Sequence, residues 1–206
     1  MYRNQFPNRA AAGQELARAL QKIPGVEGNA VVLAMPAGGE QVAAEVACLL
    51  DVPLYPLCIR KLRIPGHDSL SMGALAPGGV QWLDDELIAR LGIAESVVQN
   101  VVQKEILELQ RLDAGDYAYG RVAGSIALIV GDGISDNIHD VLAALEFAHT
   151  LNPQRLIIAS PVISAISVVS LSDKCDEIVC LHQPDMFVTA DYWYAQRLQA
   201  LKNPHA

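Results

Sequence analysis

The feature that most constrains this chain is the regular return of short apolar segments, separated by helix-length amphipathic ones. Five strand-length segments of this kind can be read from the sequence: residues 30–35, 54–59, 125–130, 155–160 and 177–181. Continuous apolar runs of this length are typical of strands buried on both faces of a parallel sheet. The alternation therefore predicts an α/β fold with a doubly wound, mostly parallel five-stranded sheet.

Helical patterns occupy most of the remaining sequence. We predict helices at residues 14–23, 41–50, 84–91, 94–112, 137–151, 164–171 and 190–201. Residues 60–83 break the alternation, because prolines and glycines interrupt any periodicity there, and they predict a mobile loop or hairpin insertion. With 206 residues, the chain suits a single domain over residues 1–206.

The composition argues against two classes of partner. The net charge of -8 and the pI near 5.0 disfavour nucleic acid, which needs clustered Lys and Arg. No apolar run approaches the roughly 20 residues that cross a bilayer, and residues 1–9 lack the apolar core of a targeting signal. The 4 cysteines form no C-x-x-C pair and lie in apolar segments, which predicts buried free thiols in a reducing compartment. We therefore expect a cytoplasmic protein with no membrane partner.

Three loops that follow predicted strands have the residue types of an anion site. Ligands of doubly wound sheets bind beyond the carboxyl ends of the strands. After the first strand, Gly38 and Gly39 allow close backbone approach, and Arg60 and Lys61 stand at the end of the second, so both point toward the same rim. Residues 131–137 open a helix, whose free amides favour an anion. Taken alone, a Gly-Gly turn after a strand is most often only a turn, and a terminal Arg-Lys pair is most often a solvated strand end.

The order of these loops resembles the type I phosphoribosyltransferases, in particular a bacterial subgroup of predicted phosphoribosyltransferases. Residues 6–13, FPNRAAAG, match the subgroup's F-x-D-R-x-x-A-G, and residues 34–39, AMPAGG, match A-L-P-R-G-G. Residues 59–62, IRKL, match the start of V-R-K-L-x-x-P. Residues 129–139, IVGDGISDNIH, align with V-V-D-D-G-I-A-T-G-A-T. The resemblance covers nearly the whole chain.

The resemblance implies a transferase that uses 5-phosphoribosyl 1-pyrophosphate and Mg²⁺. Phosphoribose would pass to an acceptor that the sequence does not identify, and the ligand would be a phosphorylated ribose or another small anion. A small hood built from residues 1–29 and 182–206 would form the acceptor pocket. A homodimer and a place in nucleotide metabolism also follow from the resemblance.

The same resemblance assigns roles to single residues. Asp132 would hold the ribose, and the catalytic roles would fall on Asp132 and Lys61. The loop Ala37, Gly38 and Gly39 would meet pyrophosphate, while Arg60 and Lys61 would neutralise its charge. The 5′-phosphate would be surrounded by Gly133, Ile134, Ser135, Asp136, Asn137, Ile138 and His139.

The chain departs from the family motif at these same loops. Gly131 replaces one of two acids, and Ala37 replaces an arginine. Asp136 stands where the motif has threonine; it would cap the following helix, and its carboxylate would occupy the amides that a phosphate would otherwise bind. Two hypotheses remain open: a transferase of low activity or altered substrate, and a non-catalytic ligand-binding or regulatory protein on the same fold.

Asp136, His139 and Asp140 also have the spacing of metal ligands on one helix face. An acidic first turn with an exposed His139 explains the same pattern through the helix dipole. We favour this second interpretation and predict no metal site made by the chain's own residues.

Overall fold

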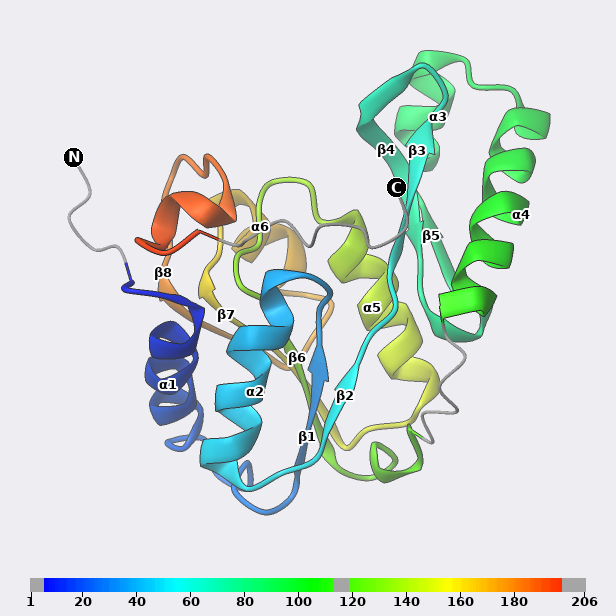
Figure 1. Ribbon diagram of the computed structural model, residues 1–206. Helices are drawn as coiled ribbons and strands as arrows, with labels where there is room; N and C mark the ends of the chain where they lie inside the picture. Colours follow the sequence, from blue (N-terminus) through cyan, green and yellow to red (C-terminus); the bar gives the residue numbers. More distant parts are fainter. Residues whose placement is uncertain (1–5, 113–118, 198–206) are drawn as a thin grey trace.

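A five-stranded parallel sheet forms the centre of the computed structural model, which describes residues 6–112 and 119–197 (Figure 1). Its strands are β1 (Ala30–Ala34), β2 (Leu54–Pro56), β6 (Ile126–Val130), β7 (Arg155–Val162) and β8 (Glu177–His182). They lie in the order β2-β1-β6-β7-β8, and every pairing is parallel. The predicted fold class is confirmed.

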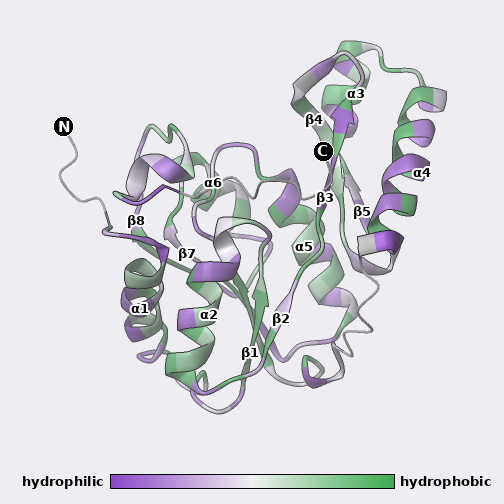
Figure 2. Cartoon of the chain, viewed as in Figure 1, coloured by the Kyte–Doolittle hydropathy of each residue, from purple (hydrophilic) through white to green (hydrophobic). Residues whose placement is uncertain are grey.

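Helices cover both faces of this sheet. They are α1 (Arg9–Leu20), α2 (Gly38–Leu50), α5 (His139–Thr150) and α6 (Ala165–Leu171). Neighbouring residues of a strand point to opposite faces. Val32 accordingly joins the core beneath α1 and α2, whereas Leu33 joins the core beneath α5. Figure 2 shows β1 in green between helices that carry purple hydrophilic residues.

A second, antiparallel sheet stands beside α5 (Figure 1). It contains β3 (Arg60–Ile64), β4 (His67–Leu75) and β5 (Gln81–Leu83), in that order. Two helices, α3 (Asp85–Leu91) and α4 (Glu95–Leu112), pack on it around a separate apolar cluster. Arg60 and Lys61 therefore begin β3 instead of ending β2.

The helix predicted over residues 190–201 is wrong for the part that the structure describes. Residues Ala190–Trp193 form one short 3₁₀ helix, η3, and Tyr194 then makes an isolated parallel bridge with Phe6. The Phe6 amide donates to the Trp193 carbonyl at 2.8 Å, and the Ala195 amide donates to Phe6 at 2.8 Å. Backbone groups that a helix would use are thus committed to the N-terminal segment. Residues 198–201 lie outside the described residues, as do residues 1–5 and 198–206 of the predicted hood.

The cysteine prediction holds only in part. No disulfide joins the cysteines among the described residues, but Cys48 is exposed and Cys58, Cys175 and Cys180 are half-buried. Across residues 6–112 and 119–197, no helix is both long enough and apolar enough to span a bilayer.

Helices α1 and α2 approach each other most closely at Gly13. A Cβ atom at Gly13 would lie 2.6 Å from the Val42 carbonyl oxygen and 2.8 Å from the Cβ of Glu45. We predict that Gly13→Ala lowers the free energy of unfolding by about 1–3 kcal/mol, because overpacking outweighs the better helix propensity of alanine. Urea denaturation would measure it. Glu15→Ala, at an exposed position of the same helix, should change stability by less than about 0.5 kcal/mol. Equal stability of Gly13→Ala and the unchanged chain would show that the helices separate at no cost.

Candidate functional site

A cavity of about 140 Å³ lies beyond the carboxyl ends of β1 and β6. It is lined by Met35, Pro36, Lys61, Gly131, Asp132, Gly133, Ile134, Ser135, Asn137, Asp140 and Val141. The structure therefore gathers Lys61, Asp132 and much of the predicted phosphate turn. Six predicted residues besides Arg60 do not line this cavity: Ala37, Gly38, Gly39, Asp136, Ile138 and His139.

The glycine loop lies against Asp132. Gly38 and Gly39 open α2 and are buried, whereas Ala37 is exposed and has a φ of 62°. A Cβ atom at Gly38 would lie 1.9 Å from Asp132 Oδ2 and 2.3 Å from Arg9 Nε. Position 38 therefore accepts only glycine while the Asp132 carboxylate covers the N-terminus of α2.

Arg9 fixes the position of Asp132. Its Nε donates to Asp132 Oδ2 at 2.8 Å, and its Nη2 lies 2.8 Å from the same oxygen and donates to Asp191 Oδ1 at 2.6 Å. The Arg9 side chain is 3% exposed and lies 4.3 Å above the ring of Tyr194. The Tyr194 hydroxyl donates to the backbone carbonyl of Asp132. Charge-assisted bonds of this kind are among the strongest in proteins.

Burial dominates the titration of this group. It raises the pKa of Asp132, although the Arg9 guanidinium acts in the opposite direction. Burial also lowers the pKa of Arg9, but its bonds to Asp191 and Asp132 outweigh this effect and raise that pKa overall. Burial and the Asp132 charge raise the pKa of Tyr194 well above its usual range. Arg9 and Tyr194 therefore keep their protons at neutral pH.

The turn before α5 keeps unused backbone donors. The Ile134 amide donates to the Val162 carbonyl at 2.9 Å. Within the described residues, the next amides find no acceptor: Ser135, Asp136, Asn137 and Ile138. Successive amides without an acceptor before a helix are groups of the kind that bind anions in proteins.

The predicted role of Asp136 as a helix cap is wrong. Helix α5 begins at His139, and Ile138 precedes it without a side-chain capping bond. Asp136 Oδ1 instead accepts a hydrogen bond from the Ser164 hydroxyl, just before α6. Ser167 of α6 donates to the Ser135 carbonyl at 2.7 Å. The Asp136 carboxylate is thus held away from the amides that it was expected to occupy.

Arg60 and Lys61 separate, because neighbouring residues of a strand point to opposite faces. Lys61 Nζ lies 3.0 Å from Asp140 Oδ2 in the cavity. Arg60 pairs with Glu105 of α4 at 2.7 Å instead. The prediction that both side chains point toward the same rim is therefore wrong.

His139 is buried, contrary to the prediction of an exposed side chain. It is 9% exposed, and its Nδ1 lies 3.0 Å from the hydroxyl of Ser71 on β4. Its Nε2 lies 3.4 Å from Asp84 Oδ2, and Trp82 packs on its ring. Asn137 Nδ2 donates to Ser71 at 3.3 Å. No group of three metal-ligating side chains occurs in the part of the chain that the structure describes.

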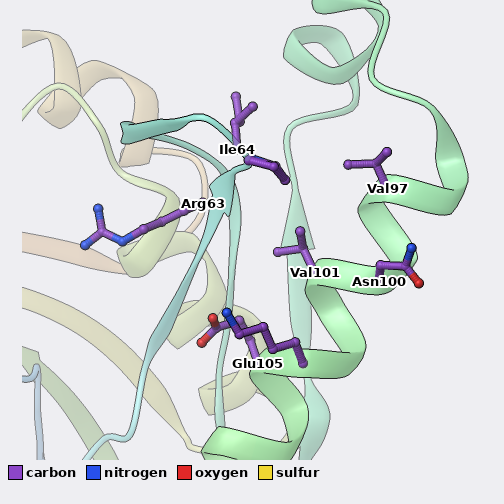
Figure 3. A pocket seen from close by; sticks show the side chains of 8 residues that line it. Arg63, Ile64, Val97, Asn100, Val101 and Glu105 are labelled. Carbon is purple, nitrogen blue, oxygen red and sulfur yellow. The ribbon is translucent and has the colours of Figure 1, made fainter.

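A larger cavity of about 530 Å³ lies between β3 and α4, away from this site (Figure 3). Val97 and Val101 of α4 point toward β3, whereas Arg63 points away from the helix. No motif in the sequence signalled this cavity. Sequence reasoning missed Asp191; it noted Arg9 only as part of a motif and weighed Asp140 only as a candidate metal ligand on one helix face.

The chain was compared with known proteins, and no protein-family model matches it. It is 34% identical over 193 residues to a Mycobacterium tuberculosis H37Rv protein named "Putative phosphoribosyl transferase Rv0571c"; the match covers 92% of this chain and 43% of that protein. The crystal structure of TT1426 from Thermus thermophilus matches at a TM-score of 0.71 and 29% identity, covering 92% and 90% of the two chains. A purine phosphoribosyltransferase from Pyrococcus horikoshii Ot3 shares the fold, at a TM-score of 0.50 and 16% identity over 88% and 85% of the chains. The chain thus has a phosphoribosyltransferase fold and is similar in sequence to proteins named putative phosphoribosyl transferases. It spans less than half the length of these curated relatives.

The ion pair between Arg9 and Asp132 should stabilise the folded chain in a pH-dependent way. We expect Arg9→Met to lower the free energy of unfolding by about 3–5 kcal/mol at pH 7, because it strands a buried carboxylate. The pKa of Asp132 is already raised in the folded chain, and loss of Arg9 raises it further. At pH 7 the buried, ionised Asp132 of the variant then lowers the free energy of unfolding. This loss disappears as the pH falls toward the ordinary carboxyl pKa of about 4, because Asp132 is then protonated in the folded chain.

Urea denaturation at pH 7 and near pH 4 measures this effect. The deficit of Arg9→Met should be smaller at the lower pH. Arg111→Met, which breaks the exposed pair with Glu108, should change stability by less than about 1 kcal/mol. A deficit of the same size at both pH values would mean that Asp132 is not the stranded group.

Proposed function

We propose that the chain is a phosphoribosyltransferase that transfers phosphoribose from 5-phosphoribosyl 1-pyrophosphate to an acceptor still to be identified. The observation that carries this proposal is that Lys61, Asp132, Ser135 and Asn137 line one cavity, within a turn whose amides at residues 135–138 find no acceptor among the described residues. The similarity of the chain to proteins named putative phosphoribosyl transferases supports it.

The cavity can bind the donor through its charged and polar ends. The amides of residues 135–138 and the α5 dipole would hold the 5-phosphate, and Lys61 would offset negative charge. Asp132 would accept a hydrogen bond from a ribose hydroxyl, while Arg9 keeps this carboxylate in place. Such positioning matters because an oxocarbenium-like centre forms as the leaving group departs.

The residues present fit Mg²⁺ as a substrate-bound ion. Mg²⁺ prefers oxygen ligands and is usually held by one or two carboxylates together with substrate phosphates. Asp132 and Asp140 are the carboxylates that line the cavity among the described residues. The ion would neutralise charge on the pyrophosphate leaving group. The homodimer and the hood of residues 1–29 and 182–206 stay predictions.

The charge balance of the site argues for weak binding of the anionic donor. Two carboxylates, Asp132 and Asp140, line the cavity, whereas Lys61 is the cation that lines it among the described residues. Ala37 adds no positive charge to the glycine loop. Like charges about 4 Å apart repel by roughly 1 kcal/mol in water and about 4 kcal/mol near a protein surface. An anionic donor is therefore held less tightly than in a site with more cations.

Release of pyrophosphate from 5-phosphoribosyl 1-pyrophosphate, measured with Mg²⁺ across a panel of nucleobases, tests the proposal. We expect release with at least one base. Lys61→Met should lower kcat/KM about tenfold or more, because it removes a phosphate-binding cation and leaves Asp140 unpaired. Lys104→Met removes an exposed lysine of α4 outside this cavity and should leave kcat/KM unchanged. Saturable binding of the donor with no release for any base would favour the non-catalytic alternative.

A further inference from the structure

We propose that Ser71 and His139 are positioning residues for the proposed transfer reaction. They fix the side chain of Asn137 and thereby hold the turn before α5 against the antiparallel sheet. Asn137 lines the cavity, whereas Ser71 and His139 do not, so both residues act through Asn137. The inference rests on the proposed function, because the role that it assigns is a role in binding the donor.

The Asn137 side chain is held at both ends of its amide. Its Nδ2 donates to the hydroxyl of Ser71 on β4 at 3.3 Å, and its Oδ1 accepts from the backbone amide of His139 at 3.3 Å. Rotation of this exposed side chain would give up both bonds at once. Asn137 therefore joins one wall of the cavity to β4.

His139 determines which way the Ser71 hydroxyl points. Ser71 Oγ lies 3.0 Å from His139 Nδ1, and His139 Nε2 lies 3.4 Å from Asp84 Oδ2. An ionised carboxylate can only accept a hydrogen bond, so the imidazole proton belongs on Nε2 and Nδ1 accepts from Ser71. The Ser71 oxygen then keeps a lone pair for Asn137. We call these four residues, Asn137, Ser71, His139 and Asp84, the polar bridge.

Further contacts keep the polar bridge in place. Ser71 is 5% exposed and His139 is 9% exposed, so water competes little for their hydrogen bonds. The ring of Trp82, on β5, packs on the His139 ring with centroids 5.0 Å apart. Asp84 Oδ1 accepts from the Leu87 amide at 2.9 Å at the start of α3, which fixes the carboxylate. The antiparallel sheet, which stands beside α5 in Figure 1, therefore presents a fixed hydroxyl to the turn.

Two members of the polar bridge are departures from the motif that the chain resembles. Asn137 stands where the motif has glycine, and His139 stands where it ends in threonine. Glycine has no side chain that could reach β4, and threonine offers one hydroxyl where imidazole offers two separate nitrogens. The two departures are thus parts of one connection. It ties the turn to the sheet whose first strand carries Lys61, and Lys61 lines the same cavity.

A double-mutant cycle tests whether Ser71 acts through Asn137. Isothermal titration calorimetry of the full chain with 5-phosphoribosyl 1-pyrophosphate and Mg²⁺ gives the dissociation constants. Ser71→Ala and Asn137→Ala should each raise the dissociation constant about tenfold, because each removes the bond that fixes the cavity wall. The double variant should bind no more weakly than Asn137→Ala alone. Additive losses, or an unchanged affinity in Ser71→Ala, would overturn the inference.

Position 139 offers a matched pair of variants that separates positioning from packing. His139→Asn keeps an acceptor near the place of Nδ1, whereas His139→Leu has none. We expect His139→Asn to bind the donor within about threefold of the unchanged chain and His139→Leu about tenfold more weakly. Equal affinities of the two variants would contradict a positioning role. Ser69→Ala, at an exposed serine of the same strand, is the control and should bind like the unchanged chain.

The direction of the hydrogen bonds can be measured without donor or activity. Long-range ¹H–¹⁵N spectra of the imidazole rings at pH 8, where histidines are ordinarily neutral, report which ring nitrogen carries the proton. The signals that disappear in His139→Leu identify His139, and its proton should lie on Nε2. A proton on Nδ1 would overturn the inference and leave the proposed function intact. Failure of the unchanged chain to bind the donor would overturn the proposed function and, with it, this inference.

Discussion

The ion pair between Arg9 and Asp132 is the interaction on which the site's geometry depends. Arg9 begins α1, Asp132 follows β6, and Asp191 lies in the short η3 helix, so one guanidinium joins segments far apart in the chain. The pair lies where β1 and β6 end, and it stands against the first residue of α2 at Gly38. Because Arg9 is buried, none of these segments can shift without exposing or stranding a charge.

Each carboxylate of the motif region has an internal partner of a different kind. Asp132 accepts from a guanidinium, Asp136 from the hydroxyl of Ser164, and Asp140 pairs with the ammonium group of Lys61. Of the three, only Asp136 stands where the motif has a neutral residue, and Ser164 is its partner. These partners leave the backbone amides of residues 135–138 without an acceptor among the described residues, in the same turn as the acidic side chains.

The sheet could be predicted because burial on both faces leaves a local signal, and the runs over β1 and β6 are buried throughout. The antiparallel sheet leaves a weaker signal in the sequence, because strand Arg60–Ile64 mixes charged and buried positions. The pairing of this strand with β4 also shifts register. The family motif pointed to Lys61 and Asp132, but a motif shows positions and not side-chain directions. The contact of Arg9 with Asp132 joins residues 123 apart, and no local pattern reveals it. The helix prediction over residues 190–201 was wrong for the same reason, because the backbone groups of Trp193 and Ala195 bond to the distant Phe6.

The antiparallel sheet is connected to the phosphate turn by polar side chains as well as by apolar packing. Ser71 of β4 contacts both His139 and Asn137, and Lys61 of β3 contacts Asp140. Asp140 Oδ1 is nevertheless buried with no hydrogen-bond partner among the described residues, which costs about 1–3 kcal/mol. Under the proposed function, a phosphate in the cavity would compete with Asp140 for Lys61, so ligand binding would bear on a contact between β3 and α5.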